Sequence, residues 1–425
     1  MNENTFKKYF DFYFHKLKVT IGTLTKWVIC AVFSGIIIGF IGACFNLLLS
    51  YVTHFRISHD YMLFLLPVAG LIIVAAYKLS GEAANTGTNL VIDAIQSDKN
   101  VPARVTPLII FSTLLTHLCG GSAGREGAAL QVGGSLGNLL GKIMKFDEKD
   151  CHIAIMCGMS ACFSALFGTP IAAAIFSMEV ISVGVMYYAA LVPCVISALI
   201  AQMIDKALNI SFSKYPLTDV IPELDVITGL KAILISILFA LASILFCMAL
   251  KKGAAAYSKI FTNQYLRIVV AGFLVITMRF VFNTTDYLGA GADIISRSFI
   301  TNCAWYVFLL KILFTAVTLG GGFKGGEIVP SLFIGAAFGS FLSTIVGLPT
   351  GLCAACGMVS VFCGVTNCPI TSFLLAVELF DPSCLKYCAL CIALTFFLSG
   401  YYSLYNSQRI VYSKYKTTFI NRNSK

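Results

Sequence analysis

The sequence contains few charged residues for its length. Of its 425 residues only 12% are charged, whereas 58% are hydrophobic and the mean hydropathy is +0.85. A soluble domain typically carries about 25% charged residues, so too little polar surface is available here to cover a globule in water. These proportions exclude an ordinary soluble protein. They indicate a polytopic membrane protein with roughly ten or more spanning or half-spanning helices.

Enzyme and metal-site motifs are also scarce. The five histidines form no HExxH motif, and the formal charge of +10 is not gathered in a soluble basic domain. We therefore expect no enzymatic activity, no cofactor, no metal site and no nucleic-acid partner. The basic excess is better explained by membrane topology, because lysine and arginine concentrate in the cytoplasmic loops of membrane proteins.

Both ends of the chain are basic, which predicts the side of the membrane on which they lie. Residues 1–25 are amphipathic and lack a signal-peptide cleavage site, so we expect an interfacial helix there. Residues 411–425 form a short tail. The positive-inside rule then places both termini in the cytoplasm of a multi-pass protein, in a bacterial inner or plasma membrane. The basic residues behind this prediction are Lys7, Lys8, Lys16, Lys18, Lys26, Arg409, Lys414, Lys416, Arg422 and Lys425.

Cysteine is unusually frequent, with sixteen residues that lie mostly in apolar runs. Two pairs have CxxC spacing, Cys353 with Cys356 and Cys388 with Cys391, and neither has a nearby histidine or aspartate. A zinc site or a disulfide framework needs a water-exposed setting. The pattern therefore favours cysteine as a small buried apolar residue.

Two stretches of the sequence repeat each other in the same order. The segment 158-GMSACFSALFGTPIAAAIFSME-179 matches 357-GMVSVFCGVTNCPITSFLLAVE-378 without a gap, and Pro170 and Glu179 align with Pro369 and Glu378. The segment 124-GREGAALQVGGSLG-137 matches 326-GEIVPSLFIGAAFG-339. These matches indicate an internal duplication, with a first transmembrane repeat at 26–205 and a second at 206–410. Repeated membrane proteins commonly bind substrate at broken helices where the repeats meet.

Glycine-rich loops precede several of the apolar segments. A helix N-terminus carries unpaired N–H groups and a partial positive charge, and glycine lets an ion approach them. Several such ends aimed at one point form an anion site. The alternative is that the glycines only permit close helix packing, and this is the favoured interpretation for Gly133, Gly137, Gly335 and Gly339. The candidate loops are 85-NTGTNL-90, 121-GSAGREGA-128, 320-GGGFKGGEIVP-330 and the segment before Tyr405.

Close packing does not explain why Arg125 and Glu126 begin a helix in an apolar run. An ionisable residue at membrane depth is a functional candidate by default. A carboxylate beside an anion site competes for the same N–H groups, and protonation releases it so that the anion can take its place. One side chain would then couple anion movement to proton movement.

These motifs resemble those of the CLC family of chloride channels and anion/proton antiporters. The loop 121-GSAGREGA-128 is similar to the family's G-(K/R)-E-G-P loop, and 325-GGEIVPSLFIGAAFG-339 is similar to its G-G-x-F-x-P segment. The resemblance covers nearly the whole chain. It implies an all-α polytopic fold of about eighteen broken, tilted helices in two inverted repeats, assembled as a homodimer with one anion pathway in each subunit.

The departures from the common pattern resemble the bacterial fluoride branch, CLC-F. The G-S-G-I-P loop reads 87-GTNLV-91, the proline of GREGP is Ala128, and Val180 stands where chloride/proton antiporters carry an internal proton-transfer glutamate. Members of that branch exchange fluoride for protons across the cell membrane. The resemblance therefore implies that fluoride is expelled from the cytoplasm, and that chloride, protons and the lipid bilayer are the other partners.

The resemblance also implies roles for individual residues. Glu126 is the gating and proton-carrying carboxylate, for which the alternative is a capping carboxylate paired with Arg125. Thr88 and Tyr405 donate hydroxyls to the anion, because fluoride needs good donors in place of lost water; alternatively they only satisfy backbone carbonyls. The anion-binding residues expected are Thr88, Asn89, Arg125, Gly127, Ile328 and Tyr405.

Other polar residues are assigned less directly. Glu327 is either a second carboxylate on the ion route or a helix N-terminal charge facing water, with Lys324 as its screen or as an anion funnel. We expect a structural role for Glu179 and Glu378, and a packing role for His117 and His152. Two functions stay open, namely fluoride/proton antiport, or chloride/proton antiport or passive chloride conduction by the same fold.

Overall fold

The computed structural model describes residues 3–83, 87–97, 99–217 and 219–424, with side chains from residue 12 onward. Asn85 and Thr86 of one candidate loop lie outside the described residues, as do the side chains of Lys7 and Lys8 and the whole of Lys425. Within the described part the chain forms sixteen α-helices and three short 3-10 helices, which confirms the helical fold. The first eight α-helices are α1 (Glu3–Ser58), α2 (Leu66–Leu79), α3 (Thr88–Gln96), α4 (Val105–Leu118), α5 (Glu126–Ile143), α6 (Glu148–Phe167), α7 (Pro170–Glu179) and α8 (Leu191–Ala207). The other eight are α9 (Val226–Ile260), α10 (Gln264–Val281), α11 (Ala292–Ser298), α12 (Val307–Gly320), α13 (Ile328–Val346), α14 (Thr350–Thr366), α15 (Pro369–Leu379) and α16 (Leu385–Leu398).

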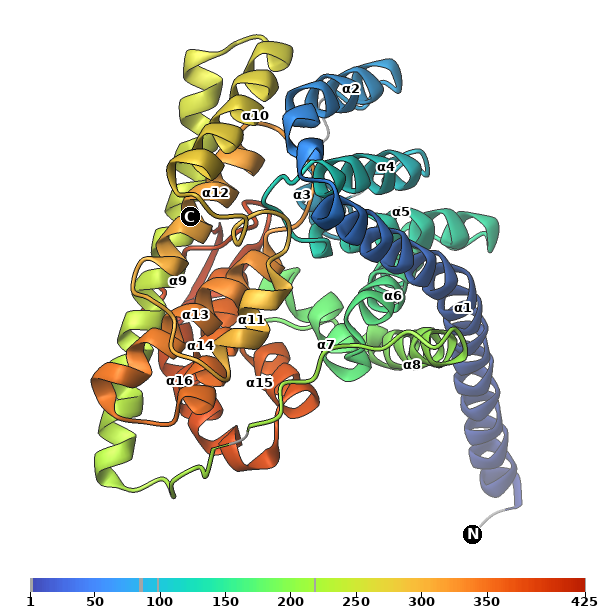
Figure 1. The fold of residues 1–425 in the computed structure, drawn as a ribbon. Helices are drawn as coiled ribbons and strands as arrows, with labels where there is room; N and C mark the ends of the chain where they lie inside the picture. Colours follow the sequence, from blue (N-terminus) through green and yellow to red (C-terminus); the bar gives the residue numbers. More distant parts are fainter. Residues whose placement is uncertain (1–2, 84–86, 98, 218, 425) are drawn as a thin grey trace.

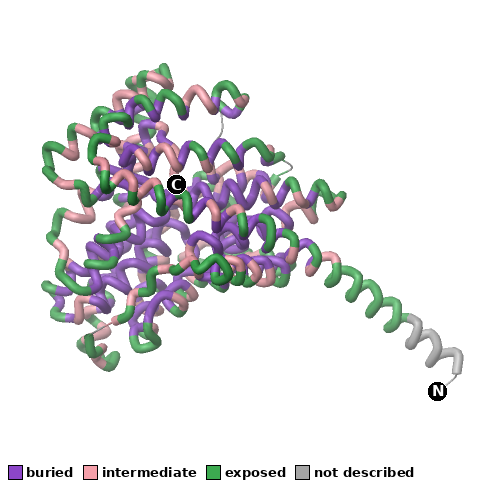
Figure 2. The backbone as a smooth tube through the Cα atoms, turned by 45° about the vertical axis from the view of Figure 1, so that its right-hand side comes forward, coloured by how far each residue is buried: buried purple, intermediate pink, exposed green. Residues whose placement is uncertain are grey.

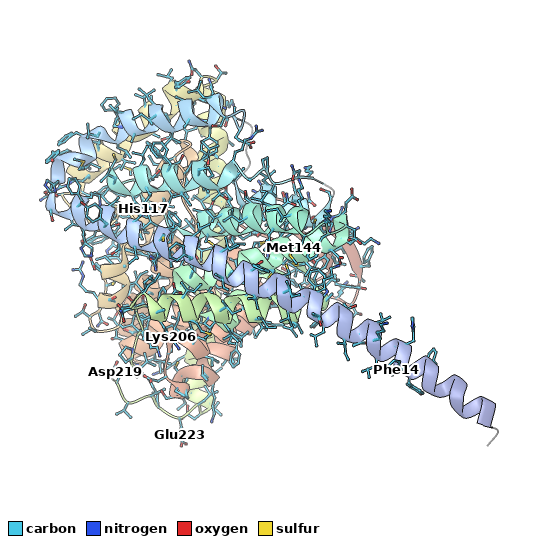
Figure 3. The ribbon with its side chains drawn as sticks, turned by 90° about the vertical axis from the view of Figure 1, so that its right-hand side faces the viewer. Phe14, His117, Met144, Lys206, Asp219 and Glu223 are labelled. Carbon is cyan, nitrogen blue, oxygen red and sulfur yellow. The ribbon has the colours of Figure 1, made fainter. Side chains whose placement is uncertain are left out.

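The helices have uneven lengths, as expected for broken membrane helices. Seven helical stretches within the described residues are long and apolar enough to cross a membrane, beginning with Phe12–Ser58 of α1. Others, such as α7 and α15, have 10 and 11 residues. Helix α1 extends beyond the bundle at its N-terminal end, where its residues are exposed (Figure 2). Figure 3 marks Phe14 on this projecting part.

The same break occurs once in each repeat. Helix α6 ends before Gly168, and α14 ends before Asn367, and both residues have the left-handed backbone conformation that stops a helix (φ +70° and +59°). Pro170 and Pro369 then begin α7 and α15, where proline is favoured because the first helical N–H has no partner. The duplicated sequence thus folds into the same helix-break-helix unit twice.

The two repeats cap each other's short helices. The carboxylate of Glu179, at the end of α7, accepts hydrogen bonds from the backbone N–H groups of Ile370 (3.0 Å) and Thr371 (2.8 Å) in α15. The carboxylate of Glu378 accepts reciprocal bonds from Ile171 (3.0 Å) and Ala172 (2.9 Å) in α7. This exchange supports the expected structural role of both glutamates.

Glycine provides close helix contacts in both repeats. Helix α5 packs on α6 and helix α13 packs on α14. The backbone of Gly133 lies against that of Gly158, and the backbone of Gly335 lies against that of Gly357, so that any side chain there would collide. Gly137 and Gly339 make similar contacts with Ala154 and Cys353. Figure 1 shows α4 to α8 on one side of the molecule and α9, α13, α14 and α16 on the other.

A small sheet, which the sequence did not lead us to expect, joins the tail to the helices. Strand β2 (Arg409–Tyr412) pairs in parallel with β1 (Ser182–Val183) and antiparallel with β3 (Phe419–Asn423). Lys414 follows β2, and its ammonium donates to the carbonyl of Phe396 (3.0 Å) and to the amide oxygen of Asn367. The tail is therefore anchored to α14 and α16 through Lys414.

All sixteen cysteines are free thiols, and most of them are buried. In the part of the chain that the structure describes, no group of three or more histidine, cysteine, aspartate or glutamate side chains is arranged to hold a metal ion. The CxxC pairs lie on α14 and α16 within the apolar core.

Candidate functional site

The two glycine loops meet as a pair of antiparallel strands of one residue each. Gly124 and Gly326 exchange both backbone hydrogen bonds at 2.7 Å. Each loop leads directly into a helix, Gly124 into α5 and Gly326 into α13. The N-termini of α5 and α13 therefore converge on one point, where their unpaired N–H groups and partial positive charges favour an anion.

Glu126 occupies this point in the structure. It is the first residue of α5 and is completely buried. Its Oε2 accepts hydrogen bonds from the backbone N–H groups of Arg125 (3.0 Å) and Val329 (3.1 Å), one from each helix N-terminus. Its Oε1 is buried without a hydrogen-bond partner. A carboxylate that is half satisfied and removed from water is costly to hold, which favours a functional role over a purely structural one.

The side chain of Arg125 points away from that of Glu126 and forms no direct ion pair with it. Its guanidinium donates to the amide oxygen of Asn46 on α1 and faces a cavity of about 600 Å³. The ion pairs found among the described residues do not include Arg125 with Glu126. Of the alternative role, the structure shows the cap, since the carboxylate accepts from the backbone N–H of Arg125, without a side-chain ion pair. The cavity wall also includes His117, Tyr215 and Val329, so the cavity borders the N-termini of α5 and α13.

Thr88 and Gly127 lie at the same convergence. Gly87 is the N-cap residue before α3 and has a positive φ of +68°. Thr88 is the first residue of the helix. The Thr88 hydroxyl lies 3.5 Å from the carbonyl oxygen of Gly127, a long and weak contact that leaves it able to donate elsewhere. A Cβ added to Gly127 would lie 3.2 Å from that hydroxyl and 3.1 Å from the carbonyl oxygen of Gly325. Gly127 thus allows three loops to come together.

Gln131 is a buried polar neighbour that the sequence analysis missed. Its amide nitrogen donates to the carbonyl of Gly127 at 3.0 Å, while its Oε1 is buried without a partner. It lies one helical turn after Gly127 in an otherwise small and apolar stretch, which is the signal that could have identified it. Together with Glu126 and Tyr405, it adds an unsatisfied polar atom to this part of the core.

Tyr405 is almost fully buried, and its hydroxyl has no hydrogen-bond partner. The segment that carries it is held from two sides. The N–H of Leu404 donates to the carbonyl of Val365 in α14 (2.9 Å), and the N–H of Ser407 donates to the amide oxygen of Asn89 in α3 (3.0 Å). Asn89 therefore positions the Tyr405 segment through its side chain.

Glu327 precedes α13 as its N-cap residue, and its Oε2 is buried without a partner. Ile328 is the first residue of α13 and is buried. Lys324 places its ammonium 4.5 Å from the centre of the Tyr77 ring, and no ion pair between Lys324 and Glu327 occurs in the described chain. Glu327 is thus a second carboxylate with an unpartnered oxygen beside the site.

Two further basic residues support the loops around the site. A ring nitrogen of His117 lies 3.2 Å from the carbonyl oxygen of Gly124, so His117 holds the first glycine loop, in line with its expected packing role (Figure 3). Lys311 in α12 is completely buried and was not predicted from the sequence. Its ammonium donates to the carbonyls of Tyr287 (3.2 Å) and Gly289 (2.7 Å).

The amino-acid sequence is similar to those of known membrane proteins. The family model described as voltage gated chloride channel matches residues 69–400. A protein named chloride/fluoride channel protein, from Pseudomonas syringae pv. tomato, is 35% identical over 399 residues, which cover 92% of this chain and 88% of that protein. The H(+)/Cl(-) exchange transporter ClcA of Vibrio vulnificus is 26% identical over 384 residues, which cover 81% of this chain and 80% of that protein.

Solved structures give the same result. The crystal structure of a CLC-type fluoride/proton antiporter matches with a TM-score of 0.87 and 31% identity, covering 91% of this chain and 98% of that chain. The structure of a slow cyanobacterial Cl-/H+ antiporter matches with a TM-score of 0.70 and 19% identity, covering 88% and 94%. At that identity the second match concerns the fold alone.

Proposed function

The chain belongs to the voltage-gated chloride channel (CLC) family, and from this premise we propose that it is an anion/proton antiporter that exports fluoride from the cytoplasm in exchange for protons. The proposal is supported by the relative named chloride/fluoride channel protein and by the structural match to a CLC-type fluoride/proton antiporter. It depends most on one observation in this chain, the carboxylate of Glu126 on the N–H groups of two converging helices.

Glu126 is the gate in this mechanism. As a carboxylate it occupies the donors of Arg125 and Val329 that an anion would use. Protonation weakens these bonds, because hydrogen bonds to a charged acceptor are roughly twice as strong as those to a neutral one. The side chain then moves away with its proton, the anion binds the vacated N–H groups, and loss of the proton reverses the exchange.

The hydroxyls near the gate favour fluoride. A small, strongly hydrated anion needs several good donors to replace its water. The hydroxyl of Tyr405 is buried without a partner, and that of Thr88 makes only a long contact. Both can therefore turn to an anion without breaking a strong bond, whereas Arg125 attracts anions into the cavity that its side chain lines.

Glu327 serves as the second carboxylate on the route. Its unpartnered Oε2 lies at the start of α13, whose N-terminus also binds Glu126. Val180, at the end of α7, offers only its backbone carbonyl, which accepts a hydrogen bond from Gln408 (3.0 Å). Protons that leave Glu126 therefore need another acid, and Glu327 is the acid that the second glycine loop provides.

The second candidate function is chloride/proton antiport or passive chloride conduction. It is favoured by relatives such as the H(+)/Cl(-) exchange transporter ClcA of Vibrio vulnificus. The same gate would serve it, since the N–H groups of two helix ends bind any small anion.

Flux from reconstituted liposomes distinguishes these functions. Liposomes loaded with fluoride or with chloride are diluted into halide-free buffer, and anion efflux and external pH are recorded together. We expect fluoride efflux accompanied by proton uptake and much slower chloride efflux. Chloride efflux with little preference for fluoride would contradict the proposal. The variant Glu126→Ala then separates exchange from conduction, because an exchanger loses proton movement whereas a channel keeps or raises its conductance.

We also propose that the chain forms a homodimer in a bacterial cell membrane with both termini in the cytoplasm. The basic residues near each end support the orientation. Fluorescent fusions to either terminus should emit light when expressed in bacteria, because green fluorescent protein matures in the cytoplasm. Chemical cross-linking in detergent should give a band of twice the monomer mass, and a purely monomeric band would contradict the dimer.

A further inference from the structure

Five of the cysteines gather where two helices pack together. Cys353 and Cys356 lie on α14, Cys388 and Cys391 lie on α16, and Cys384 directly precedes α16. The Sγ atoms of Cys356 and Cys388 are 3.9 Å apart, and those of Cys388 and Cys384 are also 3.9 Å apart. All five side chains are buried. The two CxxC motifs of the sequence thus face each other across one helix interface.

This cluster is better suited to sulfur oxidation than to metal binding. No set of three or more ligating side chains in the described residues has the arrangement of a metal site. Cys356 and Cys388, in contrast, come from different helices and are already in van der Waals contact. A disulfide requires that the two sulfurs approach to about 2 Å, so the present separation of 3.9 Å must shorten by about 1.9 Å when the bond forms.

The two helices that carry this pair both hold the Tyr405 segment. Helix α16 leads through Ser399 and Gly400 into that segment. At the end of α14, the carbonyl of Val365 accepts a bond from Leu404 (2.9 Å), and the amide of Asn367 donates to the carbonyl of Tyr402 (3.1 Å). A covalent link between α14 and α16 would therefore limit how far Tyr405 can move relative to the rest of the core.

We propose that Cys356 and Cys388 are an oxidative modification site, at which a peroxide forms a disulfide between α14 and α16 and thereby slows transport. One cysteine, as its thiolate, attacks the peroxide, so that the O–O bond breaks and a sulfenic acid and one water form. The sulfur of the other cysteine attacks the sulfenic sulfur, the S–O bond breaks and a second water leaves. In total two thiols are oxidised and one peroxide is reduced to two waters.

The cross-link is tested on the full-length protein in liposomes. Hydrogen peroxide is added, free thiols are blocked, and peptides from a digest without reductant are identified by mass spectrometry. We expect a peptide pair joined through Cys356 and Cys388 that has lost two hydrogens and that separates on reduction. A bond between Cys384 and Cys388 alone, or no bond at either residue, would overturn the proposal.

Transport is measured on the same samples, with whichever halide the reduced protein carries. We expect efflux to fall several-fold on oxidation and to recover with dithiothreitol. Only this readout rests on the proposed function, so a failed cross-link and a failed transport assay are distinguishable. An unchanged efflux rate in fully cross-linked protein would contradict the restraint on α16.

Four variants complete the test. Cys356→Ser and Cys388→Ser should lose both the cross-link and the sensitivity of transport to peroxide, and Cys356→Ala replaces the first if serine prevents folding. Cys363→Ser is the matched control, because Cys363 also lies on α14 and contacts α16, where its thiol donates to the carbonyl of Ile392. It should keep the cross-link and the sensitivity, and loss of either would overturn the assignment of the pair.

Discussion

The two glycine loops have similar backbone arrangements but carry their acidic residues at different positions. Gly124 and Gly326 pair with each other, and each begins a turn into a long buried helix. In the first loop the acid comes two residues later, as Glu126, whereas in the second it comes one residue later, as Glu327. Because one residue turns a helix by about 100°, the two carboxylates point in different directions although the loops are related by duplication.

The hydrogen bonds of the loop acids differ between the repeats, whereas the backbone hydrogen bonds of the helix-capping acids are the same in both. Glu126 accepts from the N–H groups of both helix ends, whereas the Oε2 of Glu327 has no partner. The reciprocal caps of Glu179 and Glu378, in contrast, kept the same position in both repeats. Duplication thus preserved the residues that hold the fold, whereas the acids at the meeting point differ in position and in hydrogen bonding.

The largest effect is expected from neutralising the two loop acids. Glu126→Gln should lower proton uptake on the order of 1,000-fold, the range found for losing a proton-transfer group. Glu327→Gln should lower coupled transport less, by about 100-fold, the lower end of that range, because it removes the second acid of the proposed proton route. Anion efflux and pH in liposomes measure both. Glu378→Gln is the matched control and should retain transport, and equal losses in all three variants would mean that the loop acids are not special.

The close contact between the two glycine loops is tested by adding a side chain at Gly326. A Cβ at Gly326 would lie 2.6 Å from the N–H nitrogen of Gly127 and 2.7 Å from that of Glu126. Gly326→Ala should therefore cost about 3 kcal/mol of unfolding free energy, the upper part of the range for overpacking, and it should also abolish transport. Thermal unfolding in detergent measures the loss. The control Gly229→Ala, with space around it, should leave stability unchanged or slightly raised.

A smaller loss of stability is expected when the reciprocal caps of α7 and α15 are removed. Removing either carboxylate leaves two helix N–H groups without partners, so Glu179→Ala and Glu378→Ala should each lower the unfolding free energy by about 2 kcal/mol. Glu179 should cost more, because it also accepts a bond from the hydroxyl of Thr371 (2.6 Å). Thr371→Val should remove that excess. Equal melting temperatures for all three variants and the wild type would contradict the role of the caps.

The smallest change in stability is expected at the exposed N-cap of α9. Asp225 precedes α9, and hydrogen bonds from Thr228, first from its backbone N–H, lower the pKa of this carboxyl below its ordinary 3.8. A lowered folded-state pKa stabilises the fold above the unfolded pKa and loses this effect as the pH falls through the folded value. Asp225→Ala should therefore melt slightly earlier than wild type at pH 7, and the difference should shrink as the pH falls below 3.8 and through the folded-state pKa. A difference that persists there would contradict this origin.

The sequence was sufficient to predict the helical fold and the scaffold of the site. The repeated segments around Pro170 and Pro369 predicted the duplicated break, because proline and a left-handed residue are local signals. Glu126 stood out because a charge in an apolar run is rare. Gly133 and Gly335 were assigned to close packing for the same kind of local reason, and the structure confirms these contacts.

Long-range placement could not be predicted in the same way. The pairing of Gly124 with Gly326 depends on how two repeats fold together, and no local pattern encodes it. Strands as short as β1 show no alternation of polar and apolar residues. The guanidinium of Arg125 donates to Asn46 rather than to its neighbour Glu126. This contact could not be predicted because Asn46 lies 79 positions away in the sequence. Lys311 appeared as one cation in an apolar helix, and its carbonyl partners become apparent only in three dimensions.

The exchanged caps of α7 and α15 have a consequence for biosynthesis. The amides of Ile171 and Ala172 receive their acceptor from Glu378, more than two hundred positions further along the chain. While the ribosome is still making the second half, these two amides lack the acceptor that they have in the finished fold. The N-terminus of α7 is therefore completed only after synthesis has passed residue 378.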